Sequence, residues 1–115
     1  MVRIQALRKK LGEEHLDGYL VTDVNNVYYF TEFLDAPGAA LCLVVPTDGK
    51  ATLFVPALSE TAANETVKDC AVKPVKSGEK LVDKVVGEIK QSNFKHFGFD
   101  KIAVSTYLKF LEELK

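Results

Sequence analysis

The sequence predicts an α/β domain in which a mixed β-sheet is flanked by helices. Segments with helical spacing of apolar residues alternate along the chain with short apolar segments that are typical of strands. The run at residues 39–45 is apolar at every position, which favours a central strand covered on both faces. Asp48-Gly49 lies between this run and the next strand and predicts a hairpin, so at least one strand pair is antiparallel.

The first part of the chain predicts a helix, a strand and a polar turn. Apolar residues three and four positions apart predict the opening helix; they are Ile4, Leu7 and Leu11. That helix is expected to end near His15, and a buried strand is expected at residues 19–22. Residues 23–26 are expected to form a turn, because Asp and Asn side chains bond to local backbone. Asn26 is expected to fix this turn through bonds to nearby backbone groups.

The remaining elements alternate between helix and strand. In chain order we expect a strand at residues 51–55, a helix at 58–67, a strand at 71–75, a helix at 79–91, a strand at 96–99 and a final helix that begins at Ser105 or Thr106. Pro74 cannot donate a backbone hydrogen bond, so the strand at 71–75 is expected at an edge of the sheet.

The composition is that of one ordinary globular domain, with 47% apolar and 27% charged residues in a chain of 115. Fifteen Lys and Arg stand against sixteen Asp and Glu, for a net charge of −1. Nucleic acid is therefore not an expected partner, because binding its phosphates requires an excess of positive charge. The longest apolar run is far shorter than the ~20 residues of a membrane-spanning helix. We expect no membrane partner and a cytoplasmic location, since the first residues also lack the apolar segment of a secretory signal.

No catalytic or metal-binding residue is expected in this chain. Hydrolytic metal sites need clustered His, Asp or Glu ligands, and neither His15 nor His96 has a second ligand at helical spacing. Cys42 and Cys70 form no metal or disulfide pattern, and Cys42 is expected to be a reduced core thiol. Motifs for nucleophile elbows and phosphate-binding loops are absent from the sequence.

An aromatic cluster and the loop after it are the most distinctive segment. The aromatic cluster comprises Tyr28, Tyr29, Phe30 and Phe33. These rings are expected to pin the loop onto the end of the sheet, because each ring removes roughly 150–250 Å² from water. The loop begins with Leu34, Asp35, Ala36 and Pro37. Its mixture of apolar residues, a charge, Pro and Gly is typical of loops that carry recognition.

The order of residues between Asp17 and Phe33 carries a family resemblance. The residues concerned are Asp17, the strand end Leu20-Val21-Thr22, Asn26, and the segment Tyr29-Phe30-Thr31-Glu32-Phe33. This order resembles the N-terminal domain of the creatinase, prolidase and aminopeptidase P family. The hairpin around Asp48-Gly49 and the later segment Gly98-Phe99-Asp100 extend the likeness along the chain. The resemblance implies structural roles for Asp17, Asn26, Tyr29, Thr31 and Phe33.

Two positions depart from the family pattern. Val24 stands where the family usually has Pro, and Glu32 stands where it has Gly. If that Gly adopts a positive φ, Glu32 is expected to be strained there by about 1 kcal/mol.

The resemblance implies a fold related in layout to ribonuclease H, without its acidic site. It implies a single domain at residues 1–115, with a catalytic "pita-bread" domain expected downstream. Two divalent metal ions in that second domain would support hydrolysis of a Xaa-Pro bond, while this domain contributes to a homodimer. The loop Leu34, Asp35, Ala36 and Pro37 would reach the active-site mouth of the neighbouring subunit. The expected partners are the chain's own C-terminal catalytic domain, a second subunit and, in the full-length protein, a peptide substrate.

Two alternatives remain open from the sequence. One is the front domain of a creatinase-type amidine hydrolase, and the other is the front domain of a non-catalytic, peptide-binding relative.

The last helical pattern is still periodic at Leu114 and is followed by no stop signal, which favours a chain that ends at a domain boundary. Two Asp, one His and two Glu ligands in a downstream sequence would indicate a metallopeptidase.

Overall fold

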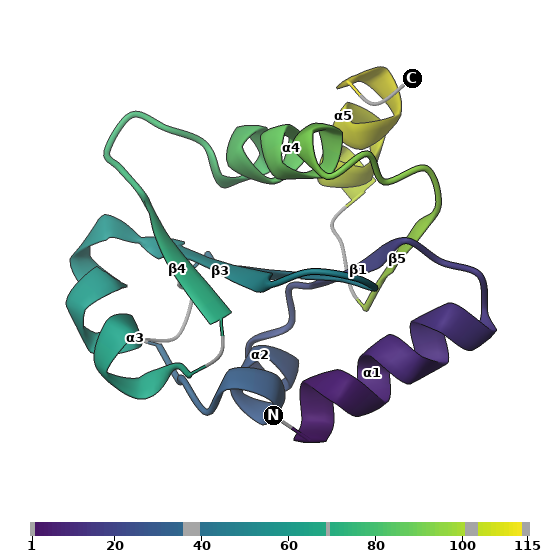
Figure 1. Cartoon of the computed structure of the whole chain (residues 1–115). Coiled ribbons are helices and arrows are strands. Elements are labelled where there is room, and N and C mark those ends of the chain that lie inside the picture. Colours follow the sequence, from purple (N-terminus) through teal and green to yellow (C-terminus); the bar gives the residue numbers. More distant parts are fainter. Residues whose placement is uncertain (1, 36–39, 69, 101–103, 114–115) are drawn as a thin grey trace.

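A computed structural model describes residues 2–35, 40–68, 70–100 and 104–113. The elements in chain order are α1 (Val2–Glu13), β1 (Gly18–Val21), α2 (Val24–Thr31), β2 (Cys42–Pro46), β3 (Ala51–Pro56), the 3₁₀ turn η1 (Ala57–Ser59), α3 (Glu60–Thr66), β4 (Cys70–Val75), α4 (Leu81–Gln91), β5 (Phe97–Phe99) and α5 (Val104–Glu113). They form three layers (Figure 1), with the sheet between α1, α2 and α3 on one face and α4 and α5 on the other.

The sheet has the strand order β4-β3-β2-β1-β5. Strand β2 is antiparallel to β1 and to β3, whereas the two edge strands β4 and β5 are parallel to their neighbours. The prediction of a mixed sheet flanked by helices is therefore confirmed. The Asp48-Gly49 hairpin joins β2 to β3, and Pro74 lies in an edge strand as predicted.

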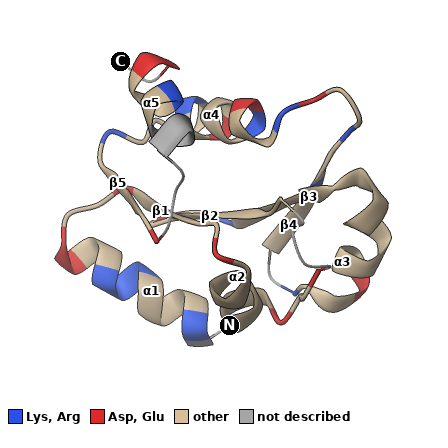
Figure 2. Ribbon diagram, turned by 180° about the vertical axis from the view of Figure 1, so that it is seen from behind, with Lys and Arg blue, Asp and Glu red and all other residues tan. Residues whose placement is uncertain are grey.

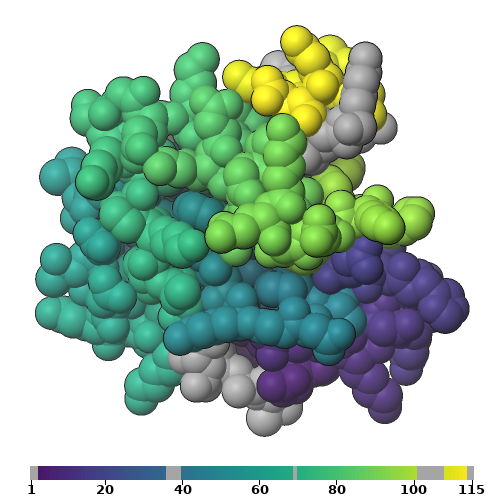
Figure 3. Space-filling view, turned by 45° about the horizontal axis from the view of Figure 1, so that its top comes forward, coloured from purple at the N-terminus to yellow at the C-terminus, as the bar shows by residue number. Residues whose placement is uncertain are grey.

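The core consists of two apolar clusters, one on each face of the sheet. Strand β2 is buried along its whole length and contributes to both. Leu43 and Val45 belong to the cluster beneath α1, α2 and α3, while Cys42 and Val44 face the other helices. Figure 3 looks onto this second layer, where α4 in green covers the sheet beside α5 in yellow. The prediction of a central strand covered on both faces is confirmed, although the strand begins at Cys42 and residue 39 lies outside the described residues.

The largest difference from the sequence prediction is helix α2. The turn predicted at residues 23–26 is the beginning of this helix, and most of the aromatic cluster lies within it. Val27 and Thr31 are buried four residues apart, so one side of the segment packs on the core with helical spacing. The polar residues at its start favoured a turn, but they serve as the cap and outer surface of a helix.

The other boundaries differ by a few residues. The helix predicted at 58–67 is α3, which is shorter and preceded by the 3₁₀ turn η1. Helix α4 begins two residues later than predicted, and α5 begins at Val104. In the described part of the chain, no helix is both long and apolar enough to span a bilayer.

Candidate functional site

Helix α2 begins at a capped end directly after strand β1. Asp23 occupies the N-cap position with extended backbone (φ −69°, ψ 128°), and its carboxylate accepts a hydrogen bond from the Asn26 N–H at 3.3 Å. Val24 is the first helical residue, where a Pro is tolerated because its missing N–H would have no partner within the helix. The family's Pro and the present Val24 therefore fit the same backbone.

The Asp100 carboxylate joins the end of β5 to the start of α2. It accepts hydrogen bonds from the backbone N–H groups of Thr22 and Asp23 at 2.9 and 3.1 Å. The Thr22 hydroxyl lies 3.2 Å from the same group, and the Asn26 side chain donates to it at 3.0 Å. The expectation that Asn26 bonds to nearby backbone was wrong, because its amide reaches a carboxylate 74 residues away.

Asp17 ties the other end of β1 to the same edge strand. One of its carboxylate oxygens accepts hydrogen bonds from the N–H groups of Lys95 and His96, at 2.8 and 2.9 Å. The hydrogen bond from the His96 N–H, with that from Lys95, lowers the pKa of Asp17 from its usual value. Asp17 and Asp100 thus clamp the short parallel pair β1–β5 at both ends.

The far end of α2 turns the chain into the loop. The Thr31 hydroxyl donates to the Val27 carbonyl at 2.7 Å and accepts from the Phe33 N–H at 3.1 Å, and both Thr31 and Phe33 are buried. Glu32 has φ 64° and ψ 11°, the left-handed region, and its N–H donates to the Tyr28 carbonyl at 2.7 Å. The positive φ expected at this position is therefore present without the family's Gly.

Beyond this turn, the loop residues differ in exposure. Leu34 is 62% exposed, whereas Asp35 is half-buried. Asp35 is therefore less accessible than Leu34 at the start of the predicted recognition loop. Ala36 and Pro37 lie outside the described residues.

The outer face of α2 presents two tyrosines. Tyr28 and Tyr29 are 50% and 51% exposed, so they do not pin the loop as the sequence predicted. Instead the Arg3 guanidinium lies 4.5 Å from the Tyr29 ring centre and donates to the Tyr29 carbonyl at 2.7 Å. Phe30, half-buried, packs against Tyr29 edge to face with ring centres 5.1 Å apart. The buried anchors of the cluster are therefore Phe33 and part of Phe30.

A groove of about 420 Å³ lies between α1, α2 and the end of β1. Its walls are mostly apolar, and the residues that line it are Leu7, Lys10, Leu11, Glu14, Leu16, Tyr19, Val21, Asn26, Tyr29, Phe30 and Asp100. Burial, and secondarily the Asp100 carboxylate, raises the pKa of the Tyr19 phenol, so this group stays neutral. Such a lining can accept an apolar group but contains no nucleophile paired with a base.

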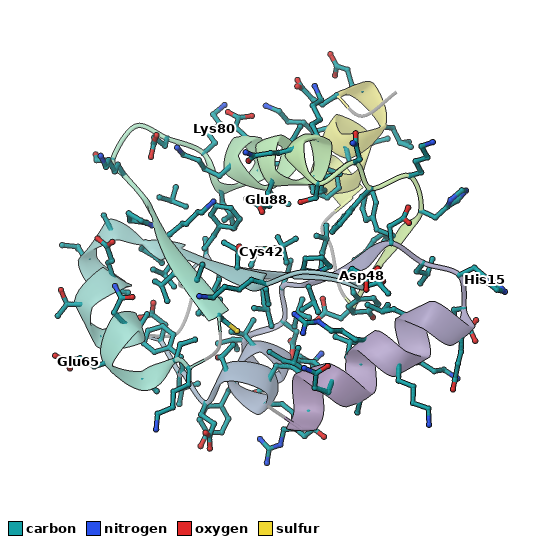
Figure 4. All side chains as sticks on the ribbon, viewed as in Figure 1. His15, Cys42, Asp48, Glu65, Lys80 and Glu88 are labelled. Atoms are coloured by element: carbon teal, nitrogen blue, oxygen red, sulfur yellow. The ribbon has the colours of Figure 1, made fainter. Side chains whose placement is uncertain are left out.

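The groups capable of metal or redox chemistry are dispersed. Among the described residues, no three His, Cys, Asp or Glu side chains lie close enough to hold a metal ion. Figure 4 shows His15 at the outer end of α1, far from Cys42 in the sheet. Cys42 is a buried free thiol, and burial raises its pKa to about 12, so it remains protonated.

Asp100 is the residue of this region that sequence reasoning did not single out. It was noted only as part of the Gly98-Phe99-Asp100 likeness, because a single Asp after a short strand carries no local signal. The helical start at Asp23 could have been recognised, since an Asp is followed by apolar residues at helical spacing, Val24 and Val27.

The mixed sheet and its two helical layers define a three-layer α/β domain with an apolar groove beside α2. A family model described as the creatinase/prolidase N-terminal domain matches residues 3–115. The chain therefore belongs to the creatinase/prolidase N-terminal domain family, and the resemblance noted in the sequence is confirmed.

Solved structures agree with this assignment. The chain is similar to a proline dipeptidase from Streptococcus pneumoniae, with a TM-score of 0.83 and 26% identity over 96% of this chain and 83% of that chain. It is also similar to a Xaa-Pro dipeptidase from Bacillus anthracis, with a TM-score of 0.84 and 20% identity over 98% of this chain but 31% of that chain. For an aminopeptidase P from Streptococcus thermophilus the TM-score is 0.79 and the identity 18%, over 98% of this chain and 85% of that chain. The comparison with curated protein sequences gives no match.

Proposed function

We propose that this chain is the non-catalytic N-terminal domain of a Xaa-Pro dipeptidase or aminopeptidase P-like metallopeptidase of the cytoplasm. Its role is to support oligomerisation and to shape the active-site mouth of a neighbouring subunit. The observation that carries the proposal is the family match over residues 3–115. The Bacillus anthracis dipeptidase supports it, because this chain corresponds to 31% of that longer protein.

The geometry at the end of α2 supports a role for the loop. Phe33 is buried, and the Thr31 hydroxyl holds its N–H, so the loop leaves the domain from a fixed point. Leu34 follows immediately and is 62% exposed. A loop fixed at its base loses little entropy on binding, so it can position a substrate or a neighbouring subunit efficiently.

Two divalent metal ions are the proposed cofactors of the longer protein. The described residues do not fit such a centre, because no group of three ligand-type side chains lies together in them. The proposed metal ligands therefore belong to the C-terminal catalytic domain, and this domain's residues act only through positioning.

The test is a kinetic comparison in the longer protein. Leu34→Ser and Asp35→Ala should change the KM, or the preference among several Xaa-Pro dipeptides, while metal content stays the same. Leu108→Ser is the matched control, because Leu108 is 57% exposed in α5, on the opposite face of the sheet from α2. Thermal unfolding of each variant checks that the fold is retained, which matters most for the half-buried Asp35.

Unchanged kinetics in both loop variants would show that the loop is only a connector. Hydrolysis of an amidine such as creatine, with no cleavage of Xaa-Pro dipeptides, would instead identify a creatinase-type enzyme.

A further inference from the structure

A second groove lies where β3 leads into the 3₁₀ turn η1, and we call it the η1 groove. Its volume is about 540 Å³, compared with about 420 Å³ for the groove beside α2. Sites that hold small molecules commonly measure roughly 300–1,000 Å³, so this groove can accept a bulky side chain. Its walls are mostly apolar, and the apolar residues that form them include Ala40, Pro56, Leu58, Val75 and Leu81.

Strand pairing brings three separate segments of the chain to the η1 groove. Pro56 pairs with Val75 at the end of the parallel ladder between β3 and β4. The antiparallel ladder between β2 and β3 begins at Cys42, so Ala40, which also lines the groove, lies beside the end of β3. Ala40 follows the loop that begins at Leu34. The groove is therefore continuous with the far end of that loop.

Leu58 offers the groove's most accessible apolar contact. Among the large apolar side chains that the structure describes, it has the highest exposure, 100%. Its backbone is nevertheless held in place, because η1 joins β3 directly to α3 and the Glu60 N–H donates to the Ala57 carbonyl. Covering such a side chain with an apolar group is favourable, because it removes apolar area from water. A fixed backbone also limits the entropy that the contact costs.

The charges that line the groove favour an apolar occupant over a basic one. Figure 2 shows charged residues, in blue and red, along the connection from β4 to α4, and two of them, Lys76 and Glu79, line the groove. Glu79 accepts hydrogen bonds from the Lys84 ammonium and the Lys76 N–H, both at 2.8 Å, and these bonds lower its pKa. In the described part of the chain, the exposed Lys76 ammonium belongs to no ion pair. A basic occupant would therefore meet an uncompensated positive charge.

We propose that the η1 groove, through Leu58, contacts the N-terminal residue of a Xaa-Pro dipeptide at the active-site mouth of the neighbouring subunit. The groove selects a bulky apolar residue at this position, and Lys76 disfavours a basic one. This inference rests on the proposed function, in which the loop that begins at Leu34 shapes that mouth, and it names the substrate class. Proline is common to all these dipeptides, so the residue that a selective contact distinguishes is Xaa.

Kinetics of the metal-loaded longer protein with Leu-Pro, Phe-Pro, Ala-Pro and Lys-Pro test this contact. Leu58→Ser removes the apolar contact, and Lys76→Ala removes the positive charge. The control for the first variant is Leu108→Ser, an exposed leucine in α5. The control for the second is Lys90→Ala, an exposed lysine in the last turn of α4. Thermal unfolding and metal content verify that each variant is folded and loaded.

We expect the two groove variants to change selectivity in different ways. Leu58→Ser should lower kcat/KM for Leu-Pro and Phe-Pro by about tenfold, as lost apolar contacts do in specificity pockets, with little change for Ala-Pro. Lys76→Ala should raise kcat/KM for Lys-Pro by about threefold, because repulsion between exposed charges is weak. That gain should disappear at high salt, which screens the charge in the unmodified protein. Both controls should leave the ratios among the four dipeptides unchanged.

Three results would overturn the inference, and they have different meanings for the proposed function. An equal loss for all four dipeptides in Leu58→Ser would place the groove against the neighbouring subunit itself, not against the substrate. Unchanged selectivity in both groove variants, together with altered kinetics in Leu34→Ser or Asp35→Ala, would remove the role of the groove and leave the role of the loop standing. Unchanged kinetics in the loop and groove variants alike would remove both roles.

Discussion

At the scale of single residues, Glu32 ends α2 with φ 64° and ψ 11°. A side chain in this region crowds the backbone, whereas glycine does not. Glu32→Gly should therefore raise the free energy of unfolding by up to about 1 kcal/mol. Part of this gain is offset because glycine gives the unfolded chain more conformational freedom. Chemical denaturation measures the change.

The control for this variant is the same substitution inside a helix. Glu65 is exposed in α3, so Glu65→Gly should lower the free energy of unfolding by about 1 kcal/mol. A Glu32→Gly chain that is destabilised to the same extent would show that its backbone conformation is not strained.

Asp17 makes the stability depend on pH in a defined direction. Its pKa in the folded chain lies below the ordinary value of 3.8, because the N–H groups of His96 and Lys95 bond to the ionised carboxylate. The stability that these two hydrogen bonds contribute is therefore fully present above pH 3.8. It is lost as the pH falls through the lower pKa of Asp17 in the folded chain.

Asp17→Asn should consequently destabilise the chain at neutral pH, with a smaller difference from the unmodified chain below pH 3.8. Unfolding midpoints across an acid pH series measure this difference, with Asp48→Asn in the exposed hairpin turn as the control. A difference that stays constant with pH would show that the Asp17 charge does not matter.

At the scale of elements, the pairing of β5 with β1 depends on side chains as much as on backbone. Three pairs of described residues join these parallel strands, and β5 is an edge strand. Asp17 and Asp100 supplement them at either end with bonds to four backbone N–H groups. Short parallel pairs are weak, so these carboxylates stabilise an edge that would otherwise fray.

A double-mutant cycle tests the Asp100 end of this clamp. Asn26→Ala removes one exposed hydrogen bond and should cost about 1 kcal/mol, whereas Asp100→Ala leaves several donors unpaired and should cost about 3 kcal/mol. In the Asp100→Ala background, Asn26→Ala should cost almost nothing, because the two residues act through one bond. Additive costs in the denaturation midpoints would contradict a direct coupling.

At the scale of the whole molecule, the polar residues that bond most extensively hold elements together and do not assemble a reaction centre. We predict that the isolated chain hydrolyses no Xaa-Pro dipeptide with any divalent metal, because ligand-type side chains do not cluster in its described part. The assay compares the chain with and without added Mn²⁺, Co²⁺ or Zn²⁺. Chelator-sensitive cleavage that follows the chain through purification would contradict this prediction.

The sequence predictions were accurate where the interactions join residues that are close in sequence, and they failed where the interactions join distant residues. The hairpin at Asp48-Gly49 and the buried strand β2 were predicted because their signals lie within a few adjacent residues. Helix α2 was missed because Asp23 and the asparagines suit both a turn and a helix start, and packing of Val27 and Thr31 on the core favours the helix. The positive φ at Glu32 was anticipated from the family's Gly alone.

The sequence by itself determined the family, the mixed α/β class and the alternation of elements, because these depend on local periodicity and on short residue patterns. Only the tertiary structure decided that Asp100 meets Thr22 across 78 residues, since this requires β5 to pair parallel with β1. It also decided that α2, with its exposed tyrosines, lies between α1 and α3 on one face of the sheet (Figure 2). Which distant residues become neighbours cannot be predicted from their separation in sequence. The order of the strands, and the face on which each helix packs, are set by burial of the whole core.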